Sequence, residues 1–149
     1  MRALLLVLLL GIGPRLEAAE VHGKTDVFAA PGVSLAWAVA RHADEAKTEV
    51  VIRVVADPAR FRSLAVTGRD PFSKAEKVLL PPVPIAGKLD VRLPRAGFAD
   101  FPRTELRFLD PAGKNALEVF YLGIPDTTPE FAEGGKLDAY LASRVAKLP

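Results

Sequence analysis

Two histidines, His22 and His42, are the side chains of this chain best suited to metal binding or proton transfer. If the chain is cut after Ala19, the mature protein begins Glu-Val-His. A histidine third from a free amine can bind Cu(II) or Ni(II) through the amine, two deprotonated amides and the imidazole, in a square plane. A cut after Ala18 removes that motif, and the mass of the mature chain distinguishes the two. His22 is therefore a candidate metal ligand only if cleavage follows Ala19, and otherwise a polar residue near the terminus.

Acid–base or nucleophilic chemistry has little support. His42 precedes Asp44 and Glu45, and a carboxylate can orient an imidazole for proton transfer. However, the chain has no Gly-x-Ser-x-Gly, no phosphate-binding glycine loop and no His-Glu-x-x-His. With no cysteine at all, thiol nucleophiles and zinc–thiolate sites are excluded. The sequence favours a non-catalytic protein without a cofactor, and a hydrolase with a noncontiguous site is one alternative.

One aromatic loop is a candidate binding surface. Phe98 and Phe101 lie between Arg95 and Arg103 in a segment without strand periodicity. Aromatic and arginine side chains dominate many recognition surfaces, and binding residues concentrate on loops. The structural alternative is that these phenylalanines fold back and close one end of the core. The same two interpretations apply to two further loop phenylalanines, Phe72 and Phe131.

The amino-terminal residues have the pattern of a secretory signal peptide. Met1 and Arg2 precede an apolar run from residue 3 to 13, and Pro14 follows. The run is shorter than the about 20 apolar residues that a membrane span needs, although an uncleaved anchor is the alternative. Small residues at 18 and 19 suit cleavage. We expect a signal peptide over 1–19, a periplasmic or secreted protein, and no stable membrane insertion after cleavage.

Charge excludes one class of partner. The formal net charge of the 149 residues is +2, so nucleic acid is not an expected partner. Residues 53–107 hold eleven Lys or Arg against six Asp or Glu, whereas the flanks 20–52 and 108–149 are each acidic by two. This asymmetry either marks a face for an anionic partner or reflects solvated charges on outward strand positions.

Period-two hydrophobicity predicts about seven short strands. Lys88–Leu93 alternates cleanly between apolar and charged residues, and the last two strands are predicted to pair as a hairpin across the Gly-containing connector 110–114. Residues 81–84 contain three prolines and are expected to form an extended connector. The predicted strands are Ser34–His42, Glu49–Ala56, Phe61–Thr67, Lys74–Leu80, Lys88–Leu93, Thr104–Leu109 and Asn115–Leu122.

The carboxyl-terminal part has helical features. The sequence Thr-Thr-Pro-Glu at 127–130 is typical of a helix start. After a Gly-Gly pair, apolar residues recur at helical spacing, which predicts an amphipathic helix over 135–148. Together these elements predict one mainly β domain over 20–149, an antiparallel immunoglobulin-like β-sandwich carrying a C-terminal helix. A small open β-barrel is the alternative architecture.

These observations favour an exported, non-catalytic binding or accessory domain. It would act through its loops or a sheet edge on another exported protein, and its candidate contacts are Phe98, Phe101, Arg95 and Arg103. A carrier of a small molecule or of copper or nickel is the other alternative. No motif in the chain identifies a family.

Overall fold

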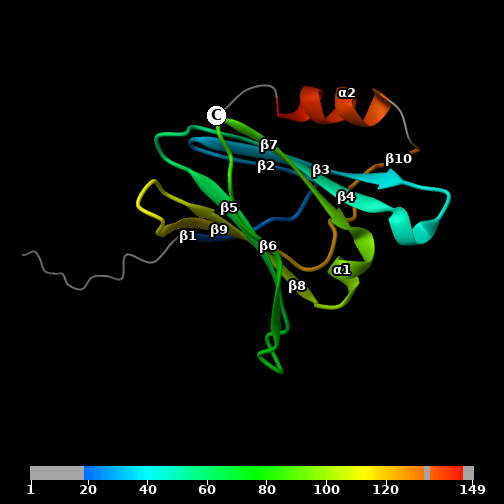
Figure 1. The fold of residues 1–149 in the computed structure, drawn as a ribbon, viewed down its shortest axis with the longest axis horizontal. Coiled ribbons are helices and arrows are strands. Elements are labelled where there is room, and N and C mark those ends of the chain that lie inside the picture. Colours follow the sequence, from blue (N-terminus) through cyan, green and yellow to red (C-terminus); the bar gives the residue numbers. More distant parts are fainter. Residues whose placement is uncertain (1–18, 133–134, 146–149) are drawn as a thin grey trace, which may run out of the picture.

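The computed structural model describes residues 19–132 and 135–145 and is mainly β. The described strands form two sheets (Figure 1). In spatial order, sheet A contains β1 (Ala19–His22), β9 (Asn115–Tyr121), β8 (Arg103–Leu109), β5 (Ser63–Arg69) and β6 (Glu76–Pro84). Sheet B contains β10 (Glu130–Ala132), β3 (Val33–Arg41), β4 (Glu49–Ala56) and β7 (Lys88–Pro94), and β2 (Val27–Ala30) pairs with β3.

The most regular sequence patterns form the predicted strands. The valine-rich segment Glu49–Ala56 is β4, and the alternating segment Lys88–Leu93 is β7 with one more residue. The predicted hairpin is confirmed, because β8 and β9 pair antiparallel and Gly113 in their turn has a φ of 82°. Glycine adopts this left-handed conformation without the steric penalty that a Cβ brings.

Strand β3 lies between the core and a helix, and the side chains on its two faces differ in size accordingly. Leu35, Trp37 and Val39 point into the space between the sheets, where Trp37 is completely buried. The alternate residues Ala36 and Ala38 face the other way and contact helix α2 (Gly135–Arg144). Small side chains on that face let the helix approach the sheet closely, which explains why this strand is so rich in alanine.

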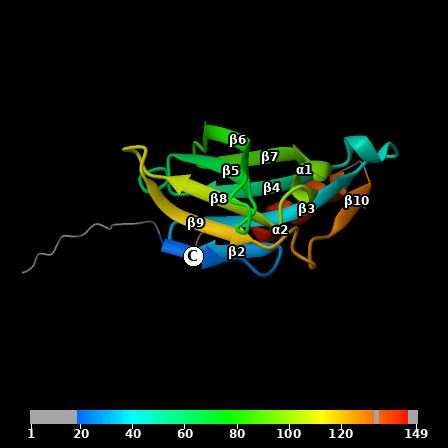
Figure 2. The same ribbon diagram turned by 90° about the horizontal axis from the view of Figure 1, so that it is seen from below.

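Helix α2 lies over the outer face of sheet B, and Figures 1 and 2 show it on the side away from sheet A. Its apolar stripe buries Leu137 and Leu141. The Tyr140 hydroxyl donates a hydrogen bond to the buried carboxylate of Asp26, just before β2. The helix thus confirms the expected element, although it ends at residue 144; residues 146–148 of the expected helix lie outside the described part.

The core lies between the two sheets. Trp37 of sheet B meets Tyr121 of sheet A edge-on, with ring centroids 4.7 Å apart. Buried residues from both sheets complete the cluster, among them Ile52, Leu64 and Phe108. The described strands form two separate sheets and no closed barrel, so the chain adopts a two-layer β architecture with a C-terminal helix.

Two local expectations are wrong, and two short strands were not predicted. Residues 127–130 do not start a helix: the Thr127 hydroxyl donates to Asp26 at 2.7 Å, and Glu130 begins strand β10, parallel to β3. The segment 81–84 is no separate connector, because it continues β6 at the edge of sheet A, where missing N–H groups are tolerated. The two further strands, β1 and β2, lie before residue 33, where no strand was predicted.

Residues 1–18 of the expected signal peptide lie outside the described part of the chain. Among the described residues, no helix has the length and hydropathy needed to cross a bilayer.

Candidate functional site

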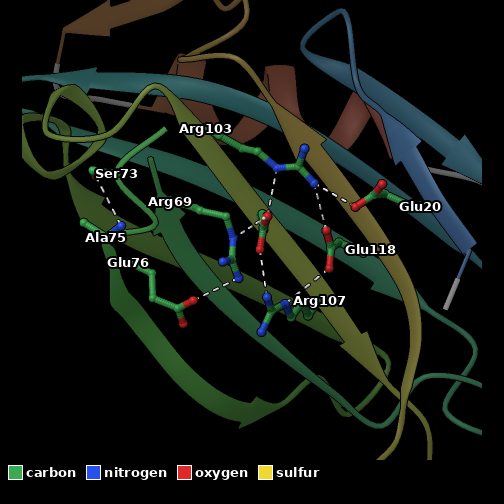
Figure 3. A network of polar contacts seen from close by, with 9 residues as sticks. Glu20, Arg69, Ser73, Ala75, Glu76, Arg103, Arg107 and Glu118 are labelled. Carbon is green, nitrogen blue, oxygen red and sulfur yellow. Dashed lines mark hydrogen bonds and ion pairs between the residues drawn. The ribbon is translucent and has the colours of Figure 1, made fainter. Parts of the chain in front are cut away.

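The outward face of sheet A carries a network of arginine and glutamate side chains (Figure 3). Strand alternation explains its position: on β8, Thr104, Leu106 and Phe108 are buried, whereas the residues between them face away from the core. The outward positions on β8 are occupied by Arg103, Glu105 and Arg107. Neighbouring strands contribute Glu20 from β1, Arg69 from β5, Glu76 from β6 and Glu118 from β9.

Glu105 is the centre of the network. Its side chain is only 3% exposed, although it lies on the outward face of the sheet. Its Oε2 accepts hydrogen bonds from Arg69 Nε at 3.0 Å and Arg103 Nε at 2.8 Å, and its Oε1 accepts from Arg107 Nη2 at 2.8 Å. Three guanidinium groups therefore cover one carboxylate, which supplies the hydrogen bonds that a buried charge requires.

A second carboxylate, Glu118, joins two of the arginines. Arg103 Nη2 donates to Glu118 at 3.2 Å and also to Glu20 at 2.7 Å. Arg107 Nε donates to the other oxygen of Glu118 at 3.3 Å. Arg103 thus connects three strands, and its contact with Glu20 helps to hold the four-residue edge strand β1 against β9.

The network borders a hollow of about 340 Å³, here called the arginine recess. Pro71 and Lys74, from the turn between β5 and β6, complete its wall, so the recess lies beside the turn of the β5–β6 hairpin. Its lining residues are Glu20, Arg69, Pro71, Lys74, Arg103, Glu105, Arg107 and Glu118.

The pKa values of the two central carboxylates are shifted in opposite directions. The three guanidinium groups around Glu105 outweigh its burial and lower the pKa of its carboxyl below the usual value. Burial raises the pKa of Glu118, and the neighbouring carboxylates Glu105 and Glu20 raise it further, against the opposing effect of Arg107. Glu105 therefore remains a fixed anion near neutral pH, and Glu118 is the group that takes up a proton first.

This difference predicts a pH effect on stability. Because the pKa of Glu118 is higher in the folded than in the unfolded chain, folding takes up protons, and stability attributable to Glu118 increases as the pH falls through its folded pKa. In Glu118→Gln this increase is absent. The free energy of unfolding of the wild type, measured in urea between about pH 7 and pH 4, should rise relative to that of the variant on acidification. A constant difference between the two proteins would contradict the assignment.

The structure separates the four predicted binding residues. Phe98 lies in the short helix α1 (Arg95–Ala99), is 3% exposed and contacts the Trp37 ring edge-on. Phe101 is half-buried, and its ring packs against Gly68 of β5, where a Cβ would come within 2.7 Å of the ring. The two phenylalanines therefore pack inward.

The two arginines of that loop belong to different ion-pair groups. Arg95 binds Glu45 at 2.6 Å and Glu130 at 3.0 Å, next to sheet B. Arg103 belongs to the network on sheet A and lies over the Phe120 ring at 3.9 Å. The two arginines thus lie in separate ion-pair groups, and Arg103 is the only one of the four predicted binding residues that lines the arginine recess.

The histidines occupy ordered positions. His22 is part of β1, and its ring stacks on Phe120 with centroids 4.8 Å apart. A square-planar amino-terminal metal site would require residues 20–22 to leave this extended strand. His42 Nδ1 accepts a hydrogen bond from the Asp44 amide at 2.9 Å. Within residues 19–132 and 135–145, no group of three or more metal-ligating side chains is assembled.

A second hollow, of about 240 Å³, lies beside Tyr121 at one end of the sandwich. The Tyr121 hydroxyl is buried and makes no hydrogen bond within the described residues. Burial raises the pKa of Tyr121 to about 12, so the hydroxyl stays protonated near neutral pH and is no general base there. The nearby Gly23 packs directly on the Tyr121 ring, where a Cβ would lie 2.3 Å from ring carbons.

The β5–β6 hairpin carries two of the three exposed large hydrophobic side chains among the described residues. Phe72 in its turn is 91% exposed and Val78 on β6 is 58% exposed; Leu122, outside the hairpin, is 65% exposed. Figure 1 shows the hairpin turn extending away from the body of the sandwich. Asp70 shapes this turn by accepting hydrogen bonds from the backbone N–H groups of Phe72 and Ser73.

Sequence reasoning missed most of the network. The period-two pattern of β8 did place Glu105 and Arg107 on an outward face, but it contained no sign that Glu105 would be buried under arginines from other strands. Comparison of the chain with protein-family models, with curated proteins and with solved structures found no match.

Proposed function

We propose that this chain is an exported, non-catalytic binding module that engages an extended segment of another exported protein along its β5–β6 hairpin. In this proposal the immunoglobulin-like sandwich serves as a rigid scaffold, and the amino-terminal signal sequence directs export. The observation that carries the proposal is the 91% exposure of Phe72 at the tip of a projecting hairpin.

The hairpin supports an aromatic contact. A fully exposed phenylalanine leaves most of its apolar surface in water, and aromatic anchors are common energetic centres of protein interfaces. Val78 is also exposed and lies on β6, the strand that the same turn leads into. Together they offer an apolar surface on an ordered hairpin, at a low entropic cost of binding.

The edge of β6 supports strand pairing. Sheet A ends at β6, whose only strand neighbour among the described residues is β5, so one row of its backbone groups is available. Prolines at 81, 82 and 84 lack the N–H that pairing requires, which limits an added strand to Glu76–Leu80. By contrast, the β7 edge of sheet B alternates the charged residues Lys88, Asp90 and Arg92, a pattern that discourages pairing.

Substitution of Phe72 and Val78 by serine is expected to reduce partner binding by at least about tenfold while leaving stability unchanged, because both side chains are exposed. The measurement is quantitative pull-down from the extracellular or periplasmic fraction, followed by affinity measurement with the retrieved protein. Hydrogen exchange should show the amides of Glu76–Leu80 becoming protected in the complex.

Leu122→Ser is the matched control, since Leu122 is equally apolar and 65% exposed but lies outside the hairpin. It should retrieve the same partner as the wild type. If the Phe72→Ser/Val78→Ser variant also binds normally, or if Leu122→Ser binds as weakly, the hairpin is not the interface.

A further inference from the structure

The arginine recess contains one cation, Lys74, that forms no ion pair within the described residues. Its lining includes four cations, Arg69, Lys74, Arg103 and Arg107, against three carboxylates, Glu20, Glu105 and Glu118, and Arg69 also binds a fourth carboxylate, Glu76, at 2.9 Å. In each of the three arginines, the guanidinium binds carboxylates through both Nε and Nη2. Within the described residues, none of the three uses Nη1 in a hydrogen bond, and Lys74 forms no ion pair.

The backbone holds Lys74 in an unusual conformation at the wall of this recess. Its φ is 67°, in the left-handed region that favours glycine. The turn maintains this conformation: Lys74 N donates to the Asp70 carbonyl at 2.9 Å, and Asp70 N donates to the Ala75 carbonyl at 2.8 Å. Lysine is more strained than glycine in this conformation, and its side chain places a cation beside three arginines. Residues held in such conformations are frequent at binding sites.

The arginines themselves are preorganised. The buried carboxylate of Glu105 binds all three guanidinium groups, and Arg103 also lies 3.9 Å over the Phe120 ring. Side chains that are already fixed lose little entropy when they bind an anion, and guanidinium groups bind carboxylates through directed, charge-assisted hydrogen bonds.

From these contacts we infer that the arginine recess binds a single carboxylate of the partner, supplied by an acidic side chain or by a chain terminus. The inference rests on the proposed function, because the recess lies beside the turn of the hairpin that would contact the partner. One negative charge pairs with Lys74, the lining cation that forms no ion pair within the described residues. A dianion such as phosphate would leave an uncompensated negative charge among the four carboxylates of the network.

Small carboxylates test the recess without the partner, so this experiment can fail while the hairpin proposal stands. The protein, expressed from its full coding sequence, is titrated with N-acetyl-glutamate α-amide, with N-acetylglycine, and with acetamide as the neutral control. NMR follows the backbone resonances and the arginine Nε–H resonances. We expect saturable binding in about the millimolar range by at least one carboxylate, with the largest shifts at Arg69, Arg103, Arg107 and Lys74. The tighter carboxylate identifies the source, side chain or terminus.

Lys74→Gly removes the unpaired cation and suits the left-handed backbone, so the fold is retained. This variant should bind the carboxylate roughly fivefold more weakly, the loss expected for one partly exposed ion pair. Lys77→Ala is the matched control, since Lys77 is exposed on the same hairpin but does not line the recess, and its binding should equal that of the wild type. Non-saturable shifts, equal binding by Lys74→Gly and wild type, or tighter binding of inorganic phosphate than of both carboxylates would overturn the inference.

Discussion

Replacement of Glu105 by alanine is expected to lower the free energy of unfolding by about 3 to 5 kcal/mol, although the residue lies on the outward face of a sheet. The carboxylate is 3% exposed and binds Arg69, Arg103 and Arg107. Without it, three partly buried guanidinium groups face one another with only Glu118, Glu20 and Glu76 as counterions. Urea denaturation of the variant measures the loss.

Glu76→Ala provides the control for this prediction. Glu76 also binds Arg69, at 2.9 Å, but its side chain is 46% exposed. Exposed ion pairs contribute between about 0 and 1 kcal/mol, so this variant should unfold almost as the wild type does. If Glu105→Ala were no less stable than Glu76→Ala, the network would be a set of independent surface pairs, and the fixed arrangement of the arginine recess would lose its support.

Phe98→Ala is expected to destabilise the protein by about 3 to 5 kcal/mol, as truncation of a buried phenylalanine usually does. Its ring is 3% exposed and lies 5.7 Å from the Trp37 ring, in an edge-on arrangement. The variant would leave a cavity beside the largest side chain of the core. Thermal or urea unfolding measures the change, and binding by the fraction that remains folded should be unaffected.

Phe72→Ala is the matched comparison, because it removes the same side chain from a position that is 91% exposed. Its stability should stay within about 0.5 kcal/mol of the wild type. The pair therefore separates the two interpretations that the sequence allows for a loop phenylalanine, closing the core or contacting a partner. A large loss of stability in Phe72→Ala, or none in Phe98→Ala, would show that the two residues have been assigned the wrong way round.

The uneven charge distribution along the chain has a tertiary explanation. Arginines of the basic segment 53–107 pair with acids of both flanks: Arg95 binds Glu45 and Glu130, and Arg103 binds Glu20 and Glu118. Arg53, which is nearly buried, binds Asp138 of helix α2 and Asp90 of β7. Much of the basic surplus is thus neutralised within the molecule, and Lys74 is one of the cations that form no ion pair within the described residues.

Local patterns in the sequence determined the elements that depend only on near neighbours. Alternation of apolar and charged residues predicted β7 and the β8–β9 hairpin, because a strand places successive side chains on opposite faces whatever lies around it. The leucine spacing predicted α2 for the equivalent reason. The mainly β class and the C-terminal helix followed from these elements.

Only the tertiary structure decided which residues meet across long separations. Thr127 has the sequence context of a helix cap, but its hydroxyl binds Asp26, 101 residues away, and the segment after it pairs with β3. The sequence places both Phe98 and Phe72 in predicted loops, and only tertiary packing made one buried and the other exposed. The arginine recess combines residues of β1, β5, β8, β9 and the β5–β6 turn. No local sequence pattern predicts that these residues lie together, because the order and register of strands in a sheet are set by the burial of the whole core.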